Sequence, residues 1–191
     1  RARAFIGKTV TSTGAVRNEV YIVDIPEDIT VAGPDGPLEG TATTFPMPPL
    51  GTVQRRLTWS DSDCGGIIRC SLDGSRIAFT RGGQIWLISP LGGDAVQATS
   101  LSAGATKPWW DPSGDYLYCV SDNSIWRTNV IEGDAQFGES ERITDPALYP
   151  GQSPDALCVA PNGQWVAFNR KVNRGDGTLV NQIFMAPIPL P

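Results

Sequence analysis

The sequence predicts an all-β protein made of short strands and tight turns, and three observations support this fold class. Glycine and proline number 21 and 16 among 191 residues, well above their usual combined share of about 12%. Charged residues make up only 18% of the chain, against a usual share of about 25%, whereas the hydrophobic content of 40% is ordinary. Apolar residues alternate with a period of two, which indicates strands rather than helices.

A repeated unit gives these strands their order. Three segments begin with a turn pair, continue as an alternating strand and then open a further strand with an aliphatic–aromatic pair. The turn pairs are Asp73-Gly74, Ser113-Gly114 and Asn162-Gly163, and the later pairs are Ile85-Trp86, Ile125-Trp126 and Ile183-Phe184. Most units close with a further element, found as VQRRLTW, AVQATSL and SERITDP. The unit therefore has four strands, a to d, with strand a preceding the turn pair.

The length of the unit predicts a β-propeller of four-stranded blades. Trp86 and Trp126 are 40 residues apart, within the period of about 40–45 residues of such blades. One blade cannot bury its sheet alone, so blades stack face to face around an axis. We expect about four blades, spanning approximately residues 1–59, 64–100, 107–145 and 154–191. The Pro/Gly-rich segment 28–51 has no strand pattern and is expected to be an insertion in the first blade, packed over its outside or partly mobile.

The strand count predicts that the chain is part of a larger propeller of six to eight blades. The first unit begins at strand b, with RAFIG, and the last unit stops after strand c. The first unit therefore lacks strand a and the last unit lacks strand d. In a ring that closes on itself, the two ends of the chain would instead complete one blade together. The remainder could be cut off, disordered, or supplied by another chain, including a second copy. A closed four-bladed ring is the alternative.

The units resemble the WD40-like repeats of TolB-type propellers. Longer stretches, among them EVYIVDIPEDIT, PLEGTATTFPMPPLGTVQRRLTW and SPDALCVAPNGQWVAF, are similar to the C-terminal half of YidR-like bacterial proteins. The resemblance implies a longer parent propeller with blades before Arg1. That family usually carries a longer loop with an Arg-His-Trp element after RRLT, but this chain has WSDSDCGGIIRC there. The family has no established activity, so the resemblance implies a fold and not a chemistry.

The composition excludes several classes of function for this chain. It has no histidine, which excludes Ser-His and Cys-His catalysis and His-based zinc or manganese sites within it. It has no G-x-S-x-G, P-loop or G-x-G-x-x-G motif. We therefore expect no catalytic residue, no metal and no cofactor here. A net charge of −5 disfavours nucleic acid, and no apolar run is long enough for a membrane span. The compartment stays open, with the cytoplasm slightly favoured over the periplasm.

Candidate ligand-binding residues lie on the connections from strand d to the next strand a. These connections form one end of a propeller, which we call the mouth. Lys107 and Trp109 in ATKPWWDPSG could form a platform for a sugar or peptide, while alternation places Trp110 in the core. Simple packing between blades is the other interpretation of Trp109. Asp61 and Asp63 could share a calcium ion, but calcium needs six to eight oxygens, and an Asp/Ser turn is the alternative.

Two further candidates belong to NRKVNRGDGTLVN, which is predicted to be a long polar loop between strands b and c. Arg170 and Arg174 could contribute there to a partner-binding face, because long loops on rigid scaffolds often carry function. The Arg-Gly-Asp triplet in this loop is interpreted as coincidence.

The four cysteines follow no metal or redox spacing. Cys119 occupies an apolar strand position, where a free thiol behaves as a small hydrophobe. Buried thiols are the favoured interpretation, with one disulfide between Cys64 and Cys70 as the alternative.

The sequence as a whole favours a non-catalytic binding or scaffold module that recognises a protein or a glycan at the propeller mouth. The alternative is the C-terminal part of an enzyme, a lyase or hydrolase acting on a sugar or peptide, whose catalytic residues lie in missing blades.

Overall fold

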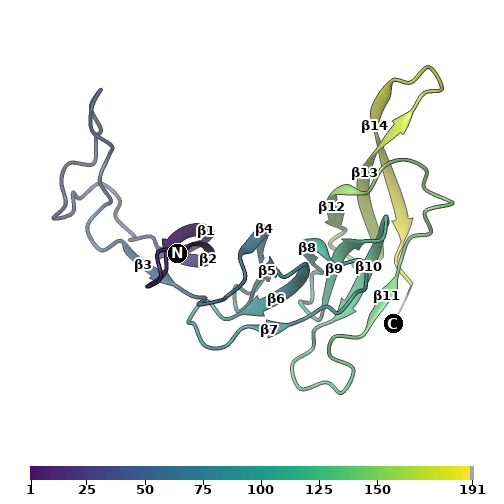
Figure 1. Cartoon of the computed structure of the whole chain (residues 1–191), viewed down its shortest axis with the longest axis horizontal. Coiled ribbons are helices and arrows are strands. Elements are labelled where there is room, and N and C mark those ends of the chain that lie inside the picture. The colour runs from purple at the N-terminus through teal and green to yellow at the C-terminus, as the bar shows by residue number, and fades with distance from the viewer. Residues whose placement is uncertain (190–191) are drawn as a thin grey trace.

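The computed structural model describes residues 1–189, which fold entirely into strands, turns and connections without a helix. The strands form four antiparallel sheets that follow one another along an arc (Figure 1). The predicted all-β fold class is therefore confirmed. Within the described range there is accordingly no helix long and apolar enough to span a membrane.

The strands are numbered in chain order. The first sheet holds β1 (Ala2–Val10), β2 (Val16–Asp24) and β3 (Val53–Arg56). The second holds β4 (Cys64–Cys70), β5 (Ile77–Arg81), β6 (Gln84–Ile88) and β7 (Val96–Gln97). The third holds β8 (Thr106–Trp110), β9 (Tyr116–Ser121), β10 (Ser124–Asn129) and β11 (Ser140–Arg142). The fourth holds β12 (Asp155–Val159), β13 (Trp165–Asn173) and β14 (Leu179–Pro187).

The sheets reproduce the strand count expected from the sequence. The second and third sheets are complete, with strands a to d in order across each sheet. Within the described residues, the first sheet has only strands b to d and the fourth has only strands a to c. The a strands β4, β8 and β12 lie on the concave side of the arc, whereas β7 and β11 lie on its convex side (Figure 1). We call β4, β8 and β12 the inner strands.

Tight turns join each inner strand to strand b. The glycines of the three turn pairs, Gly74, Gly114 and Gly163, have φ values of 74°, 82° and 68°. Residues with a Cβ rarely adopt this left-handed conformation, so the glycine of each pair allows the chain to reverse within two residues.

Three apolar clusters lie between adjacent sheets and form the core. Successive side chains of a strand point to opposite faces of its sheet. A sheet with a neighbour on each face therefore supplies side chains to two clusters. The cluster between the first and second sheets includes Val20, Cys64 and Phe79. The next includes Ile85, Trp110 and Leu117, which confirms the predicted core position of Trp110. The cluster between the third and fourth sheets includes Ile125, Leu157 and Phe168.

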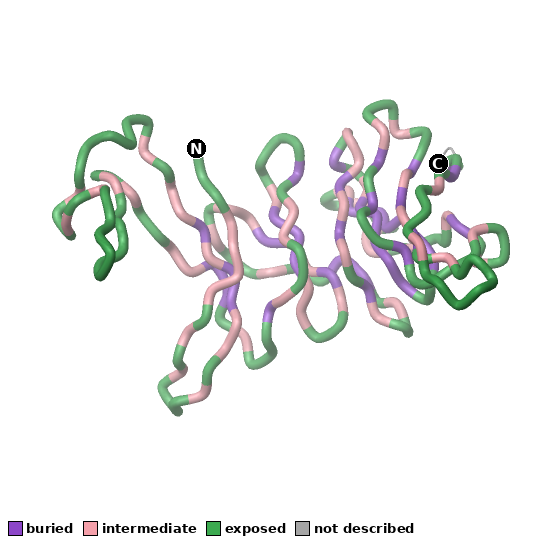
Figure 2. The backbone as a smooth tube through the Cα atoms, turned by 90° about the horizontal axis from the view of Figure 1, so that it is seen from above, coloured by how far each residue is buried: buried purple, intermediate pink, exposed green. Residues whose placement is uncertain are grey.

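The segment between β2 and β3 projects away from the sheets (Figure 1). Most of its residues are exposed, as Figure 2 shows, and Phe45 is 87% exposed. Its backbone bonds mainly to itself, for example from the Met47 N–H to the Pro37 carbonyl at 3.1 Å, and Ala32 pairs with Pro49 in an isolated bridge. Of the two expectations for segment 28–51, packing over the outside of the first blade is therefore wrong. The segment makes a few backbone hydrogen bonds within itself and buries little apolar surface.

Candidate binding site on the inner strands

A β-bulge interrupts every inner strand at the same place. The pairing register shifts between Gly65 and Arg69 in β4, between Thr106 and Trp109 in β8, and between Asp155 and Cys158 in β12. A bulge adds residues to one strand and turns the following side chains to a new direction. The three bulges therefore redirect the side chains near the mouth on three neighbouring inner strands.

Each bulge contains a residue with a positive φ. These residues are Gly66, Lys107 and Ala156, with φ values of 71°, 56° and 47°. Glycine adopts this conformation freely, but lysine and alanine do so at a cost of about 1 kcal/mol. Sequence reasoning missed the bulges, because extra residues in strand a are visible only once the register with strand b is known.

Lys107 joins the third and fourth sheets at this level. Its ammonium lies 3.0 Å from Asp155 Oδ1 and donates to the Pro154 carbonyl at 3.1 Å. Two hydrogen bonds lower the pKa of Asp155. The larger effect comes from the Ala156 N–H and the next from the Lys107 ammonium. The Lys107 and Asp155 side chains are 33% and 62% exposed, so the pair contributes little to stability and both groups remain open to solvent.

Trp109 packs against the core between the third and fourth sheets and carries a cation on its ring. The Arg69 guanidinium carbon lies 4.6 Å from the ring centroid, a cation–π contact between the second and third sheets. Arg69 Nε is buried and has no hydrogen-bond partner within the described part of the chain. Two depressions, of about 200 and 410 Å³, both include Arg69 and Trp109 in their walls. We call these adjoining depressions the inner groove.

The inner groove is largely apolar apart from its charged residues. Its smaller depression reaches Lys107, Asp155 and Leu157, and the larger one reaches Trp110 and Pro161. Of the predicted site residues, the structure thus brings Lys107 and Trp109 together, and it adds Arg69 and Asp155, which sequence reasoning did not select. The sequence around Arg69 and Asp155 gives no sign that these two residues lie beside Lys107 and Trp109.

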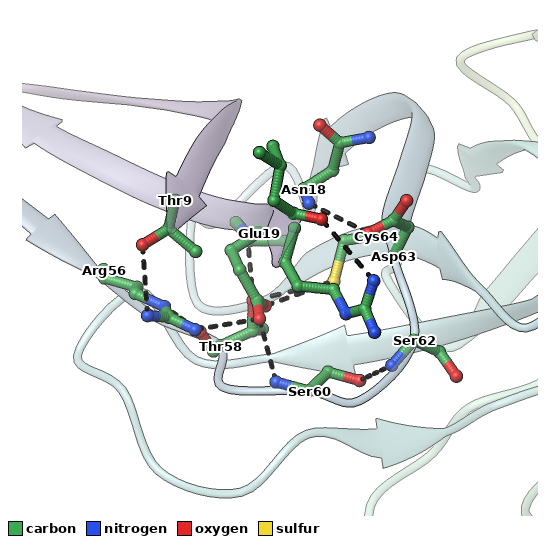
Figure 3. A network of polar contacts seen from close by, with 12 residues as sticks. Thr9, Asn18, Glu19, Arg56, Thr58, Ser60, Ser62, Asp63 and Cys64 are labelled. Carbon is green, nitrogen blue, oxygen red and sulfur yellow. Dashed lines mark hydrogen bonds and ion pairs between the residues drawn. The ribbon is translucent and has the colours of Figure 1, made fainter. Parts of the chain in front are cut away.

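Asp61 and Asp63 lie on the connection from β3 to β4, apart from the inner groove. Asp63 Oδ1 accepts the N–H of Asn18 at 3.0 Å, which ties the connection to β2 (Figure 3). Asp61 is exposed. Residues 1–189 contain no group of three or more His, Cys, Asp or Glu side chains placed to hold a metal ion.

A buried carboxylate beneath this connection was not anticipated. Glu19 is fully buried and accepts hydrogen bonds from Arg56 Nη2 and from the Ser60 N–H, both at 2.9 Å (Figure 3). The Thr58 hydroxyl also donates to it. Glu19 thereby fixes the β3–β4 connection at the mouth. Its counterpart in the second sheet is Gln84, so a polar residue directly before the aliphatic residue of strand c is the signal that could have revealed it.

Arg170 was predicted in an exposed loop, and the structure corrects this. It lies within β13 and is 1% exposed. Its guanidinium donates to the carbonyls of Gln152 at 2.8 Å, of Asn123 at 2.6 Å and of Tyr149. The two strands of the hairpin extend further than predicted, because their pairing continues to Asn173. Arg170 therefore holds neighbouring connections together, whereas Arg174 lies exposed at the short hairpin tip.

The four cysteines are free thiols. Cys64 and Cys70 stand at opposite ends of β4, and their partners Arg81 and Ile77 are four residues apart on β5. The two cysteines are therefore on the order of 13 Å apart, beyond the reach of a disulfide. The disulfide alternative is therefore wrong. Cys64 and Cys119 are buried as expected, but Cys70 and Cys158 are exposed.

Comparisons with known proteins agree with this architecture. TolB from Acinetobacter baumannii superposes with a TM-score of 0.53 at 13% identity, over 95% of this chain and 39% of that chain. The chain has the TolB-type β-propeller fold. A putative TolB from Agrobacterium tumefaciens superposes with a TM-score of 0.51 at 16% identity, over 98% of this chain and 71% of that one.

In sequence, the chain is similar to the uncharacterized protein YidR of Escherichia coli K12. The two are 36% identical over 183 residues, which cover 87% of this chain and 43% of YidR. The expected resemblance to YidR-like proteins and TolB-type propellers is thereby confirmed. The chain spans less than half the length of YidR, and no family model matches it.

Proposed function

We propose that this propeller chain is a non-catalytic binding module that recognises an extended protein segment in the inner groove. The observation that carries the proposal is the Arg69–Trp109 pair between two largely apolar depressions. Ligand sites are commonly apolar hollows with a few placed polar groups. Here the Lys107–Asp155 pair supplies such groups at one end, and Arg69 supplies another between the two depressions.

The chemistry of the groove favours a protein segment over a glycan. Arg69 lies over the Trp109 ring, which also packs against the core, so the ring offers little free face for a sugar. A guanidinium has a planar fork of donors that matches a carboxylate or a backbone carbonyl. Two adjoining apolar hollows suit side chains that project from an extended backbone.

Recognition in the inner groove can be tested with two unbiased probes, a displayed peptide library and a glycan array. Peptides selected on the wild-type chain are then measured against Arg69→Ala, with Arg174→Ala as a matched control far from the groove. Loss of a hydrogen bond to a charged group costs about 1.5–3 kcal/mol, so Arg69→Ala should weaken binding about 10- to 100-fold. Arg174→Ala should leave binding unchanged. Binders that are insensitive to Arg69→Ala would refute the proposal, and binding of glycans alone would replace it with the glycan interpretation.

A further inference from the structure

A hollow opens between the second and third sheets at the end opposite the mouth, where the a–b turns and the c–d connections lie. Its volume of about 680 Å³ is within the usual range of ligand pockets. Both sheets have all four strands, so complete blades form its two walls. Leu87, Ile131 and Phe137 contribute apolar surface, and Phe137 also packs against the core between these sheets. We call this feature the bottom hollow.

The rim of the bottom hollow is acidic. Four exposed carboxylates line it, those of Asp73, Asp94, Asp115 and Glu132. The Asp73 carboxylate accepts the Ser71 hydroxyl at 2.6 Å, whereas the other three form no ion pair with any of residues 1–189. Such a rim attracts cations and repels anions.

Arg76 also lines the bottom hollow, but its guanidinium is engaged with the walls. It donates to the Val130 carbonyl at 2.5 Å and to the Gly114 carbonyl. Its guanidinium carbon lies 4.8 Å from the centroid of the Trp110 ring. Arg76 therefore links the second sheet to the third and leaves the carboxylates of the rim in excess.

The third sheet carries a charged pair where the second sheet is apolar. Leu87 and Arg127 each directly follow the tryptophan of strand c, so they occupy equivalent positions. Their partners in strand d are Val96 and Glu141. The same cross-strand pair is thus aliphatic beside the bottom hollow and ionic beside the next gap.

Arg127 fills the gap between the third and fourth sheets and is only 4% exposed. Its Nε donates to Glu141 Oε1 at 2.6 Å, and its Nη1 donates to the Pro189 carbonyl just beyond β14 at 2.8 Å. Its guanidinium carbon lies 4.9 Å from the centroid of the Tyr116 ring. A guanidinium on an aliphatic stem therefore fits this position of the repeat. The second sheet has Leu87 there, which leaves room for a cation from outside.

We propose that the bottom hollow is the docking site of an arginine side chain from a partner protein, held beside an apolar residue of the same segment. The stem of the arginine packs on Leu87 and Phe137, and its guanidinium binds carboxylates of the rim. The planar fork of donors matches carboxylates, and the remaining apolar surface suits the neighbouring side chain. The proposal does not depend on the function proposed for the inner groove, which carries cations and lies on the inner strands.

Nuclear magnetic resonance on the ¹⁵N-labelled chain tests the proposal with three probes. The first is the capped peptide acetyl-Leu-Arg-Phe-amide, and the second is the same peptide with glutamine in place of arginine. The third is acetyl-arginine amide, which has the cation without the flanking apolar residues. Each is titrated at low salt, where contacts between exposed charges are least screened.

Two variants alter the hollow in different ways. Asp94→Asn with Glu132→Gln removes two carboxylates from the rim. The matched control, Asp35→Asn with Glu39→Gln, makes the same change in net charge on the exposed segment between β2 and β3.

The second variant, Leu87→Arg with Val96→Glu, gives the second sheet the charged pair of the third. Its own guanidinium should then occupy the hollow, so the arginine peptide should no longer bind.

The arginine peptide should shift the amide signals of Leu87 and Phe137 and leave those around Trp109 in the inner groove unchanged. Loss of two exposed charge contacts should weaken its binding about 5- to 10-fold in the rim variant, and the matched control should change it less than about twofold. The glutamine peptide should bind at least as weakly as the arginine peptide binds the rim variant.

Equal binding of the arginine and glutamine peptides would overturn the proposal, as would binding that the rim variant leaves unchanged. The absence of shifts at about 10 mM peptide, ten times a Kd of about 1 mM, would also overturn it. Equal binding of acetyl-arginine amide would assign the hollow to a small cationic molecule and overturn the docking of a protein segment.

Discussion

Replacing Glu19 with alanine tests whether the buried network at the mouth stabilises the first sheet. Glu19→Ala removes one carboxylate that accepts three hydrogen bonds. The donors are Arg56 Nη2, the Thr58 hydroxyl and the Ser60 N–H. Glu19 is fully buried, and only 23% of the Arg56 side chain is exposed, so water can replace little of what is lost. Breaking such a buried pair from one side costs about 3–5 kcal/mol.

The expected change is large enough to measure by thermal unfolding. For a domain of this size, 1 kcal/mol corresponds to a shift in Tm of about 2–4 °C, so Glu19→Ala should lower Tm by about 10 °C. Circular dichroism or calorimetry on purified chains provides the measurement. Glu27→Ala removes an exposed acid from the connection after β2 and serves as the control, with an expected change of less than about 0.5 kcal/mol.

The second sheet supplies a stricter comparison. Gln84 occupies the position of Glu19, and its Oε1 accepts the Thr99 hydroxyl at 2.8 Å and the Leu101 N–H at 3.1 Å. A neutral amide therefore serves as an acceptor in this place. Glu19→Gln keeps one acceptor oxygen but loses the charge beside Arg56, so it should cost about 1.5–3 kcal/mol, less than Glu19→Ala. If Glu19→Gln lowered Tm as much as Glu19→Ala, the charge and not the acceptor geometry would dominate, and the reasoning would be refuted. A Glu19→Ala chain as stable as the wild type would refute it equally.

Three further predictions concern the bulges, the thiols and acid stability. Ala156→Gly relieves a φ of 47° and should raise the free energy of unfolding by about 0.5–1 kcal/mol. The control Ala167→Gly within β13 should lower it. Denaturant unfolding measures both, and the opposite ranking would contradict the strain argument. Burial raises the pKa of Cys119 to about 12, so at pH 8 iodoacetamide should label the exposed Cys158 of the folded chain well before Cys119, and equal labelling seen by peptide mass spectrometry would disprove this. Hydrogen bonds led by the Ser71 hydroxyl lower the pKa of Asp73 to about 2. A lowered pKa in the folded state contributes stability above the unfolded pKa, and this stability is lost as the pH falls to the folded pKa. The Tm should therefore fall between about pH 4 and 2 by less in Asp73→Asn than in wild type, and parallel pH profiles would argue against this contribution.

Much of the fold could be predicted from the sequence, because turns and alternation are local signals. The turn pairs and the aliphatic–aromatic pairs gave the order of strands b and c, and the missing strand at each end was counted correctly. The extent of the last hairpin was misjudged, since Arg170 and its neighbours are polar but continue the pairing to Asn173. A long polar side chain in a strand can be buried when backbone carbonyls surround it, and no local pattern reports that.

The candidate site was predicted only in part. Lys107 and Trp109 stand out in the sequence as a cation beside aromatic residues, and they do lie in the inner groove. Arg69 and Asp155 are far from them in sequence and reach the same groove through packing between sheets. Convergence of this kind depends on bulge geometry and inter-sheet contact, which a single sequence does not encode locally.

The shared bulge places residues of different kinds at one backbone position of successive inner strands. Gly66, Lys107 and Ala156 occupy the same backbone conformation on successive inner strands, yet they carry no side chain, a long cation and a methyl group. In the second sheet the position is restricted to glycine, because a Cβ at Gly66 would lie 2.6 Å from Thr80 Oγ1, whereas the third and fourth sheets accept a side chain there. The same backbone therefore presents no side chain, then a cation, then a methyl group, so the lining of the concave side differs in chemistry from one sheet to the next.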